Sequence, residues 1–353
     1  MAVTRIWFNR WFSSAYNIID LIKNNEEGKN FEIFVSHSNK YSITLQNADY
    51  SFIEPDLPDN DYIEYCIDFC KKHNINIFVP YHQLMLISNN VEQFENINIK
   101  VLASNNVDLL NLINDKVLFY NDIKSKNILK IPEYYVVDTK ESFINAYNKL
   151  KLIGRVCFKP TDGVGGAGFR IIKESKTTIE DILTGFPSYS IYLDDILALL
   201  PEKCRFQNIM LMEYLDGYEY SIDCLADKNG NLIRAIPRKK IDKYNRYLEN
   251  NKDLIRIAHK VGEAYKIPYI YNIQVIYKNE EPNLLEINTR MAGGIHSTCM
   301  SGVNLPYEAI KVLMDESIST SDVNLDIMVG NIETRIICDS INNVNCSKVL
   351  MNV

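Results

Sequence analysis

The sequence of 353 residues contains no block of lysine and arginine, and its formal net charge is −7. Binding to a nucleic acid backbone needs a positive surface, so a nucleic acid partner is not expected. The amino-terminal stretch lacks the apolar run and the small-residue cleavage site of a signal peptide. Nowhere do about 18 apolar residues follow one another. We therefore expect no membrane segment.

The eight cysteines form no CxxC pair and no cluster with histidine at zinc-binding spacing. Cys66 and Cys70 lie one helical turn apart, where two buried thiols are favoured over a metal site. This pattern predicts a protein of the reducing cytoplasm. The sequence also lacks a Ser/His/Asp or Cys/His arrangement, so we expect no covalent enzyme intermediate.

The first hundred residues alternate strand-like and helix-like patterns. With 46% hydrophobic and 24% charged residues the chain is expected to fold, and its length predicts two to three domains. The expected strands are 5–8, 31–37 and 75–81, and the expected helices are 13–25, opened by a serine cap, and 61–73. Such alternation predicts a parallel sheet covered by helices. No GxGxxG follows the first strand.

The pattern changes from about residue 111. Residues 114–127 read as a helix, 131–138 as a strand and 141–151 as a second helix. The segments that follow are rich in aromatic and β-branched residues and are separated by turn signals. They predict an antiparallel sheet rather than further βαβ units.

Four of only 14 glycines fall within six residues, at Gly163, Gly165, Gly166 and Gly168. Clustered glycines let consecutive N–H groups converge on phosphate oxygens. A dinucleotide fingerprint would have to open a helix, whereas FRII follows here, and a Walker A loop would need Lys and Ser/Thr where Phe169 and Arg170 stand. The alternatives left are a hairpin folded over a nucleotide and an ordinary glycine-rich hairpin.

A second cluster, before and after the glycine run, holds polar side chains that suit a nucleotide. Lys159 precedes the glycine run, and Glu213 and Glu219 flank a turn at Asp216-Gly217. Lys159 is alternatively a surface lysine, and the two glutamates are alternatively solvated.

The third cluster is an expected hairpin of 269–277 and 282–294. Period-two alternation places Asn272 and Gln274 on one face of its first strand. It places Glu286, Asn288 and Arg290 on one face of its second strand. Oxygen donors of this kind suit Mg²⁺, and an arginine beside them suits a transferring phosphoryl group. The alternative is an amphipathic hairpin with one wet face.

Taken together, these motifs resemble the ATP-grasp superfamily, and within it the carbamoyl phosphate synthetase-like and carboxylate–amine ligase branch. The motifs occur in that family's order between residues 111 and 315: Asn114-Asp115-Lys116, Lys159-Pro160, the loop 162–168, EYLDGYEYSID, NIQ and LLEINTRMAGG. The implied fold class is α/β and α+β, with an N-terminal Rossmann-like (pre-ATP-grasp) parallel sheet domain at 1–110. An ATP-grasp fold of two α+β subdomains that clamp the nucleotide follows at 111–353, with a lid near 150–213.

The resemblance implies a role for each matching residue. Lys116 and Lys159 would contact the α- and β-phosphates, with Lys159 and Arg290 serving catalysis, and Arg290 would steady an acyl phosphate. The loop of Asp162, Gly163, Gly165, Gly166 and Gly168 would close over the triphosphate. Glu213 and the backbone of Leu215 would meet the adenine, and Glu219 the ribose. Gln274, Glu286 and Asn288 would hold two Mg²⁺ ions, for which Mn²⁺ could substitute.

The reaction implied is attack of a substrate carboxylate on the γ-phosphate of ATP, followed by displacement of phosphate by an amine. A single ATP-binding unit excludes a full carbamoyl phosphate synthetase. MAGGIHSTCMSGVN after Arg290 resembles small amino-acid and dipeptide ligases more than biotin carboxylase. A kinase or carboxylase on the same scaffold and a nucleotide-sensing module are the alternatives. The implied substrates are a small carboxylate and a small amine, and the resemblance is compatible with a homodimer.

A substrate site is expected near five residues: Arg238, Lys239, Gly293, Gly294 and His296. A cation on the strand around Arg238 and Lys239 could hold a carboxylate, and His296 after the paired glycines could border the acceptor site. Solvated basic residues and a structural histidine are the alternatives.

Overall fold

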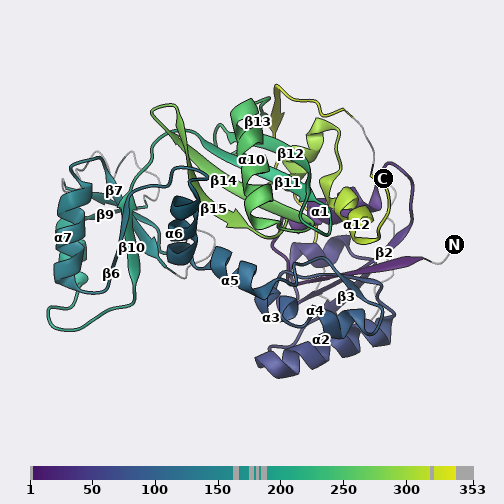
Figure 1. Cartoon of the computed structure of the whole chain (residues 1–353). Coiled ribbons are helices and arrows are strands. Elements are labelled where there is room, and N and C mark those ends of the chain that lie inside the picture. The colour runs from purple at the N-terminus through teal and green to yellow at the C-terminus, as the bar shows by residue number, and fades with distance from the viewer. Residues whose placement is uncertain are drawn as a thin grey trace. The chain divides into compact units, whose positions relative to one another are not determined.

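The computed structural model describes residues 3–161, 167–174, 189–318 and 322–338, together with residues 179 and 183. The chain divides into two compact units. The first unit comprises 1–110, 220–274 and 287–353, and the second comprises 111–219 and 275–286. Figure 1 labels elements of both units where there is room. The domain limits expected from the sequence, 1–110 and 111–353, stay a prediction.

The first unit begins with the predicted parallel sheet, in the order β3-β2-β1-β4-β5. Its strands are β1 (Thr4–Asn9), β2 (Phe31–His37), β3 (Tyr50–Ile53), β4 (Ile77–Val79) and β5 (Lys100–Val101). The strand order reverses between β1 and β4, which makes their carboxyl ends the switch point of the sheet. The strand expected over 75–81 is shorter than predicted.

Helices cover this sheet because β1 is apolar on both faces. The helical elements are α1 (Ala15–Lys23), η1 (Ile43–Asn47), α2 (Asp59–His73), α3 (Leu84–Ser88), α4 (Val91–Glu95) and α5 (Val107–Asn114). Ile6 and Phe8 pack with α1, whereas Trp7 points to the other face and packs with α2. The thiols of Cys66 and Cys70 are buried in α2 and free, as expected.

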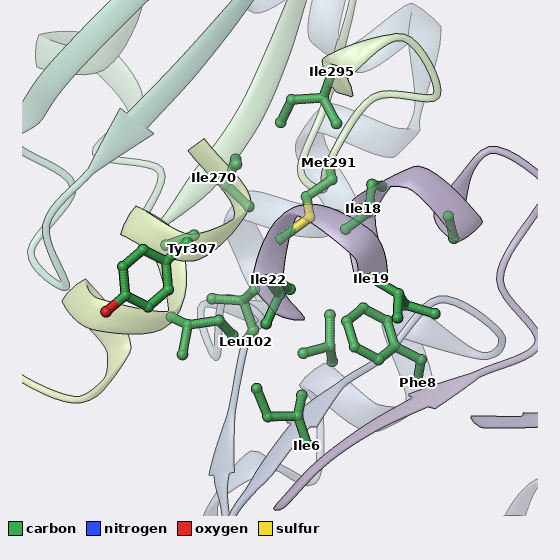
Figure 2. Packing of buried hydrophobic residues seen from close by; sticks show 14 of the residues in the cluster. Ile6, Phe8, Ile18, Ile19, Ile22, Leu102, Ile270, Met291, Ile295 and Tyr307 are labelled. Carbon is green, nitrogen blue, oxygen red and sulfur yellow. The ribbon is translucent and has the colours of Figure 1, made fainter. Parts of the chain in front are cut away.

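The core beneath α1 also holds residues from the other end of the sequence. Ile18 and Ile22 of α1 share this core with Met291, Ile295 and Tyr307, and Figure 2 shows these side chains. The stripe Ala15, Ile18, Ile19 and Ile22 has the spacing of a buried helix face. Ser14 precedes α1 as predicted, but it does not cap the helix. Its hydroxyl donates instead to the carbonyl of Gly293, at 2.7 Å.

The second unit contains a sheet in the order β6-β10-β7-β8-β9. The pairs of β10 with β6, of β10 with β7 and of β7 with β8 are antiparallel, as expected. The pair of β8 with β9 is parallel, so the prediction of an antiparallel sheet is wrong for this edge. Its strands are β6 (Tyr134–Val137), β7 (Val156–Pro160), β8 (Arg170–Lys173), β9 (Ser190–Tyr192) and β10 (Ile209–Glu213). Its helices are α6 (Lys116–Lys126), α7 (Lys140–Leu150) and α9 (Leu193–Leu199).

A third sheet follows the order β15-β14-β11-β12-β13-β16. Its strands are β11 (Glu219–Ala226), β12 (Leu232–Lys240), β13 (Asn245–Leu248), β14 (Ile270–Lys278), β15 (Glu281–Asn288) and β16 (Ile327–Gly330). The helical elements of this region are α10 (Lys252–Tyr265), α11 (Ile295–Thr298), η2 (Cys299–Ser301) and α12 (Leu305–Leu313). The hairpin of β14 and β15 is as predicted, but β15 ends at Asn288, so Arg290 lies beyond the strand.

Among the described residues, no helix combines the length and apolarity that crossing a bilayer requires.

The core beneath α1 gives a matched pair of methionine variants. Met291 is 1% exposed and packs in that core, whereas Met300 is 63% exposed. We expect Met291→Ala to lower the free energy of unfolding by about 2 to 5 kcal/mol, because it leaves a cavity. Met300→Ala should change it by less than about 0.5 kcal/mol. Denaturant unfolding followed by tryptophan fluorescence measures both, since Trp7 and Trp11 lie in the first unit. Equal losses would contradict this assignment of the core.

Candidate nucleotide site

Two of the predicted lysines meet a predicted metal ligand within the second unit. Lys159 lies on β7 and is half-buried, and burial lowers its pKa below the ordinary value. The charge of Glu286 opposes this shift, and the charge of Lys116 adds to it. The ammonium group of Lys116 donates to the carbonyl of Thr161 at 3.2 Å. Glu286 and Lys116 are therefore the charged neighbours of Lys159.

Local structure explains the position of Lys116. The side chain of Asp115 accepts hydrogen bonds from the backbone N–H groups of Val117 and Leu118, both at 2.9 Å. This N-cap fixes the start of α6, so that Lys116 is its first residue. Asn114-Asp115-Lys116 is therefore a helix start with a lysine fixed beside it.

Tyr120 lies beside Lys159 and the backbone next to Glu286, and its role was missed in the sequence. It follows Lys116 by four residues on α6 and so lies on the same helix face. Its hydroxyl donates to the carbonyl of Leu285 at 2.8 Å, next to Glu286. The ammonium group of Lys159 lies 5.9 Å from its ring centroid. Burial raises the pKa of Tyr120 far above its ordinary value, so the hydroxyl stays a donor.

The glycine run connects β7 and β8, which pair as antiparallel strands with Phe158 opposite Arg170. A helix does not follow the loop, so the dinucleotide fingerprint is excluded and the strand-loop-strand prediction is confirmed. Gly168 has φ +74°, and a Cβ there would lie 2.7 Å from the ring of Pro160. Asp162, Gly163, Gly165 and Gly166 lie outside the described residues.

The residues predicted at the adenine lie at the end of β10. Glu213 is buried, and its backbone N–H donates to the carbonyl of Glu133 at 2.9 Å. Its carboxylate forms an ion pair with Lys278. Leu215 is also buried, and Glu219 opens β11. The adenine and ribose roles of these residues stay predictions.

The turn after Glu213 depends on a glycine. A Cβ on Gly217 would lie 1.9 Å from the carbonyl oxygen of Tyr277, and the N–H of Tyr277 donates to the carbonyl of Tyr218 at 3.1 Å. Only glycine lets the two backbones approach this closely. The turn that the sequence indicated is thereby held against β14.

A pocket of about 480 Å³ lies in the second unit, and the Glu213–Lys278 pair is part of its wall. The rest of the wall is formed by Lys124, Asn127, Leu129, Lys130, Ile131, Pro132, Glu133, Tyr134, Asn279, Glu281 and Asn283. Lys116, Lys159 and Glu286 do not line it. The pocket and the charged cluster are thus separate features of this unit.

The predicted metal ligands lie on adjacent strands. Glu286 and Asn288 are two residues apart on β15 and share one face of that strand, and Gln274 lies on the neighbouring strand β14. In the described part of the chain, no group of three or more His, Cys, Asp or Glu side chains is placed to hold a metal ion. A donor set of one carboxylate and two amides suits Mg²⁺ that takes its other oxygens from phosphates.

Arg290 packs against aromatic rings of the first unit. Its guanidinium carbon lies 5.2 Å from the ring centroid of Tyr81 and 5.8 Å from that of Phe12. One of its N–H groups donates to the carbonyl of Met291 at 3.1 Å. Period-two alternation predicted that Arg290 lies on the strand face, and it indicated neither ring.

Arg238 belongs to a buried polar network. Asp223, 1% exposed, accepts hydrogen bonds from Asn272 at 2.7 Å and from Thr298 at 2.5 Å, and it pairs with Arg238 at 3.4 Å. Arg238 also donates to the hydroxyl of Thr298 at 2.9 Å. The polar side chain of Asn272, which the alternation placed inside an apolar strand, thus faces the carboxylate of Asp223. The carboxylate-binding role expected for Arg238 stays a prediction, although its charge is already balanced.

The other residues expected at the substrate lie near this network or in contact with it. A Cβ on Gly294 would come within 2.6 Å of the Arg238 guanidinium. His296 is half-buried, burial lowers its pKa, and its buried Nδ1 has no hydrogen-bond partner within the described structure. The ammonium group of Lys239 lies 5.7 Å from the ring centroid of Tyr220.

Solved structures share the fold of this chain at low sequence identity. The biotin carboxylase domain of the Hydrogenobacter thermophilus 2-oxoglutarate carboxylase is 16% identical, with 93% of this chain and 74% of that chain covered and a TM-score of 0.62. Biotin carboxylase from Campylobacter jejuni is 19% identical, with 93% and 74% covered and a TM-score of 0.62. N5-carboxyaminoimidazole ribonucleotide synthetase from Thermotoga maritima is 16% identical, with 91% and 78% covered and a TM-score of 0.60.

These structures share the fold of this chain, which is an amino-terminal parallel-sheet domain followed by an ATP-grasp fold. Residues 205–335 match a family described as ATP-grasp in the biosynthetic pathway with Ter operon, and residues 14–102 match the PylC-like N-terminal domain. The ATP-grasp resemblance that the motifs predict is thus confirmed over residues 205–335, which include the NIQ and LLEINTRMAGG motifs. A search of curated protein sequences finds no match.

The buried Asp223 network gives a prediction about stability. Asp223→Asn removes the charge that balances Arg238 and places an amide among groups that already donate. We expect it to lower the free energy of unfolding by about 3 to 5 kcal/mol, because a buried cation is left unpaired. Asp322→Asn, at an exposed position, should change it by less than about 0.5 kcal/mol. Denaturant unfolding measures both, and a loss below about 1 kcal/mol for Asp223→Asn would contradict the role of this pair.

Proposed function

We propose that this chain is an ATP-dependent ligase that activates a small carboxylate as an acyl phosphate and joins it to a small amine. The observation that carries the proposal is the cluster of Lys116, Lys159 and Glu286 within one unit, where Tyr120 contacts Lys159 and the backbone next to Glu286. Two cations beside one carboxylate suit a polyphosphate that brings a divalent metal ion. The ATP-grasp family match is consistent with this assignment.

The residues would divide the work of phosphoryl transfer. Lys116 and Lys159 would bind oxygens of the α- and β-phosphates, and the loop 162–168 would cover the triphosphate. Glu286 and Asn288, with Gln274, would hold two Mg²⁺ ions. When bound, magnesium neutralises the phosphate oxygens that become more negative as the γ-phosphoryl group leaves. Arg290 would bind the transferring phosphoryl group.

Two displacement steps follow from this arrangement. A carboxylate oxygen of the substrate attacks the γ-phosphorus, the bond to the bridging oxygen of ADP breaks, and ADP leaves. The amine nitrogen then attacks the acyl carbon, the carbon–oxygen bond to phosphate breaks, and the amine proton passes to phosphate or water. Neither step requires a nucleophilic side chain of the protein.

A carboxylase is the second candidate. The Hydrogenobacter thermophilus neighbour was solved in complex with MgADP, ADP and a bicarbonate anion. Bicarbonate carries the same pair of oxygens as a carboxylate and could take its place. In such a reaction bicarbonate would attack the γ-phosphorus, and the same lysines would bind the nucleotide. Dependence of ADP release on bicarbonate alone would favour this candidate over the ligase.

Nucleotide binding can be tested without knowing the substrates. Saturation with magnesium and a non-hydrolysable ATP analogue at about a hundred times Kd should add about 2.7 kcal/mol of stability, a shift of several degrees in Tm. We expect Lys159→Ala and Glu286→Gln to lose most of this shift. Lys203→Ala and Glu141→Gln, at exposed positions of the second unit, should retain it.

Turnover is then measured as ADP release from Mg-ATP with a defined mixture of free amino acids, which supply both carboxylates and amines. Release that needs the mixture supports the ligase. A protein that shows no thermal shift with the nucleotide, or that releases ADP equally with and without the amino acid mixture, would contradict it.

A further inference from the structure

We propose that Tyr81 and Phe12 are positioning residues that hold Arg290 for phosphoryl transfer, an inference that rests on the proposed function. Both side chains come from loops at the carboxyl ends of β1 and β4, where the strand order of the parallel sheet reverses. Arg290 lies beyond β15, where no strand pairing fixes it. Its contacts with the rings of Tyr81 and Phe12 fix the position of the Arg290 side chain instead.

The rings of Phe12 and Tyr81 pack on one another and on Trp11, and they form one aromatic surface. The ring centroids of Phe12 and Tyr81 are 5.1 Å apart in an edge-to-face arrangement. The buried ring of Trp11 lies behind them, 5.2 Å from Phe12 and 5.4 Å from Tyr81. Such contacts restrict each ring to one orientation. The guanidinium of Arg290 lies against this aromatic surface.

Backbone contacts fix the two loops that carry the rings. The buried side chain of Asn9 accepts a hydrogen bond from the N–H of Tyr81 at 2.7 Å and donates to the carbonyl of His82 at 3.0 Å. The indole N–H of Trp11 donates to the carbonyl of Val79 at 2.8 Å. The loop after β1 is therefore tied to the end of β4.

A second set of contacts ties the loop after β1 to the loop that carries Arg290. Ser14 donates to the carbonyl of Gly293 at 2.7 Å, and a Cβ on Gly293 would lie 3.7 Å from the ring of Phe12. Met291, next to Arg290, is buried in the core beneath α1 together with Trp11. The residues that follow Arg290 are thus fixed against α1 and the loop that carries Phe12.

The chemistry of the contact leaves the arginine ready for an anion. A guanidinium that rests on an aromatic face keeps its N–H groups in its own plane, where they can bind phosphoryl oxygens. Within the described part of the chain, no carboxylate forms an ion pair with Arg290, in contrast to Arg238 and Asp223. Aromatic rings therefore orient this cation without cancelling its charge.

The first test separates chemistry from nucleotide binding. We expect Tyr81→Leu and Phe12→Leu to lower kcat for ADP release by about 10- to 100-fold, because a small displacement of a catalytic group has effects of this size. The KM for ATP and the thermal shift with the non-hydrolysable analogue should stay at the wild-type values. Tyr81→Phe, which keeps the ring, should keep most of the activity, and Tyr41→Leu, 55% exposed, serves as the control. Wild-type kcat in both leucine variants would overturn the proposal.

The second test reads the packing directly. The side-chain Nε–Hε resonance of Arg290, assigned by its loss in Arg290→Lys, should be shifted upfield by the rings. Tyr81→Leu should abolish most of that shift and Tyr81→Phe should preserve it. An unshifted resonance in the wild type would overturn the proposal even if the enzyme is active. If the wild type binds nucleotide but releases no ADP with the amino acid mixture, the proposed ligase function is contradicted, and the positioning role is contradicted with it. An upfield-shifted Arg290 resonance in that inactive protein would show that the aromatic packing is purely structural.

Discussion

Burial of Met291 beneath α1 determines where the arginine of the candidate site can lie. The apolar stripe of α1 covers one face of the parallel sheet, and Met291, Ile295 and Tyr307 fill the same core from the far end of the sequence (Figure 2). Arg290 is the residue before Met291, so burying one side chain places the other at the switch point of the sheet. The loops that follow β1 and β4 of the amino-terminal sheet thereby contact Arg290 through Phe12 and Tyr81.

Electrostatic balance distinguishes the charged groups of the chain. Arg238 lies in a buried network and its charge is balanced by Asp223, an arrangement typical of a structural pair. Arg290 rests on Tyr81 and Phe12, and Lys159 is half-buried with Lys116 and Glu286 as its charged neighbours. Cations that are oriented but incompletely neutralised are the groups that can bind an anionic ligand.

The sequence predicted the elements better than the contacts between them. Apolar periodicity identified β1, β2, α1, α2 and the hairpin of β14 and β15, because each buries a face with a regular spacing. It could not end β15 before Arg290, since alternation continues through the loop. Tyr120, Tyr81 and Phe12 were missed because an aromatic residue that supports a charged group looks like any core residue. Asp223 was missed because its partners lie 15 to 75 residues away.

The central claim is that a carboxylate, and not water, receives the γ-phosphoryl group. It can be tested by running ATP turnover in H₂¹⁸O with Mg-ATP and unlabelled free amino acids, and by measuring the oxygen isotopes of the released phosphate. Attack by a carboxylate leaves the phosphate without ¹⁸O, because its fourth oxygen comes from the unlabelled acid. One ¹⁸O atom per phosphate would show that water attacks the γ-phosphorus, and it would contradict the ligase.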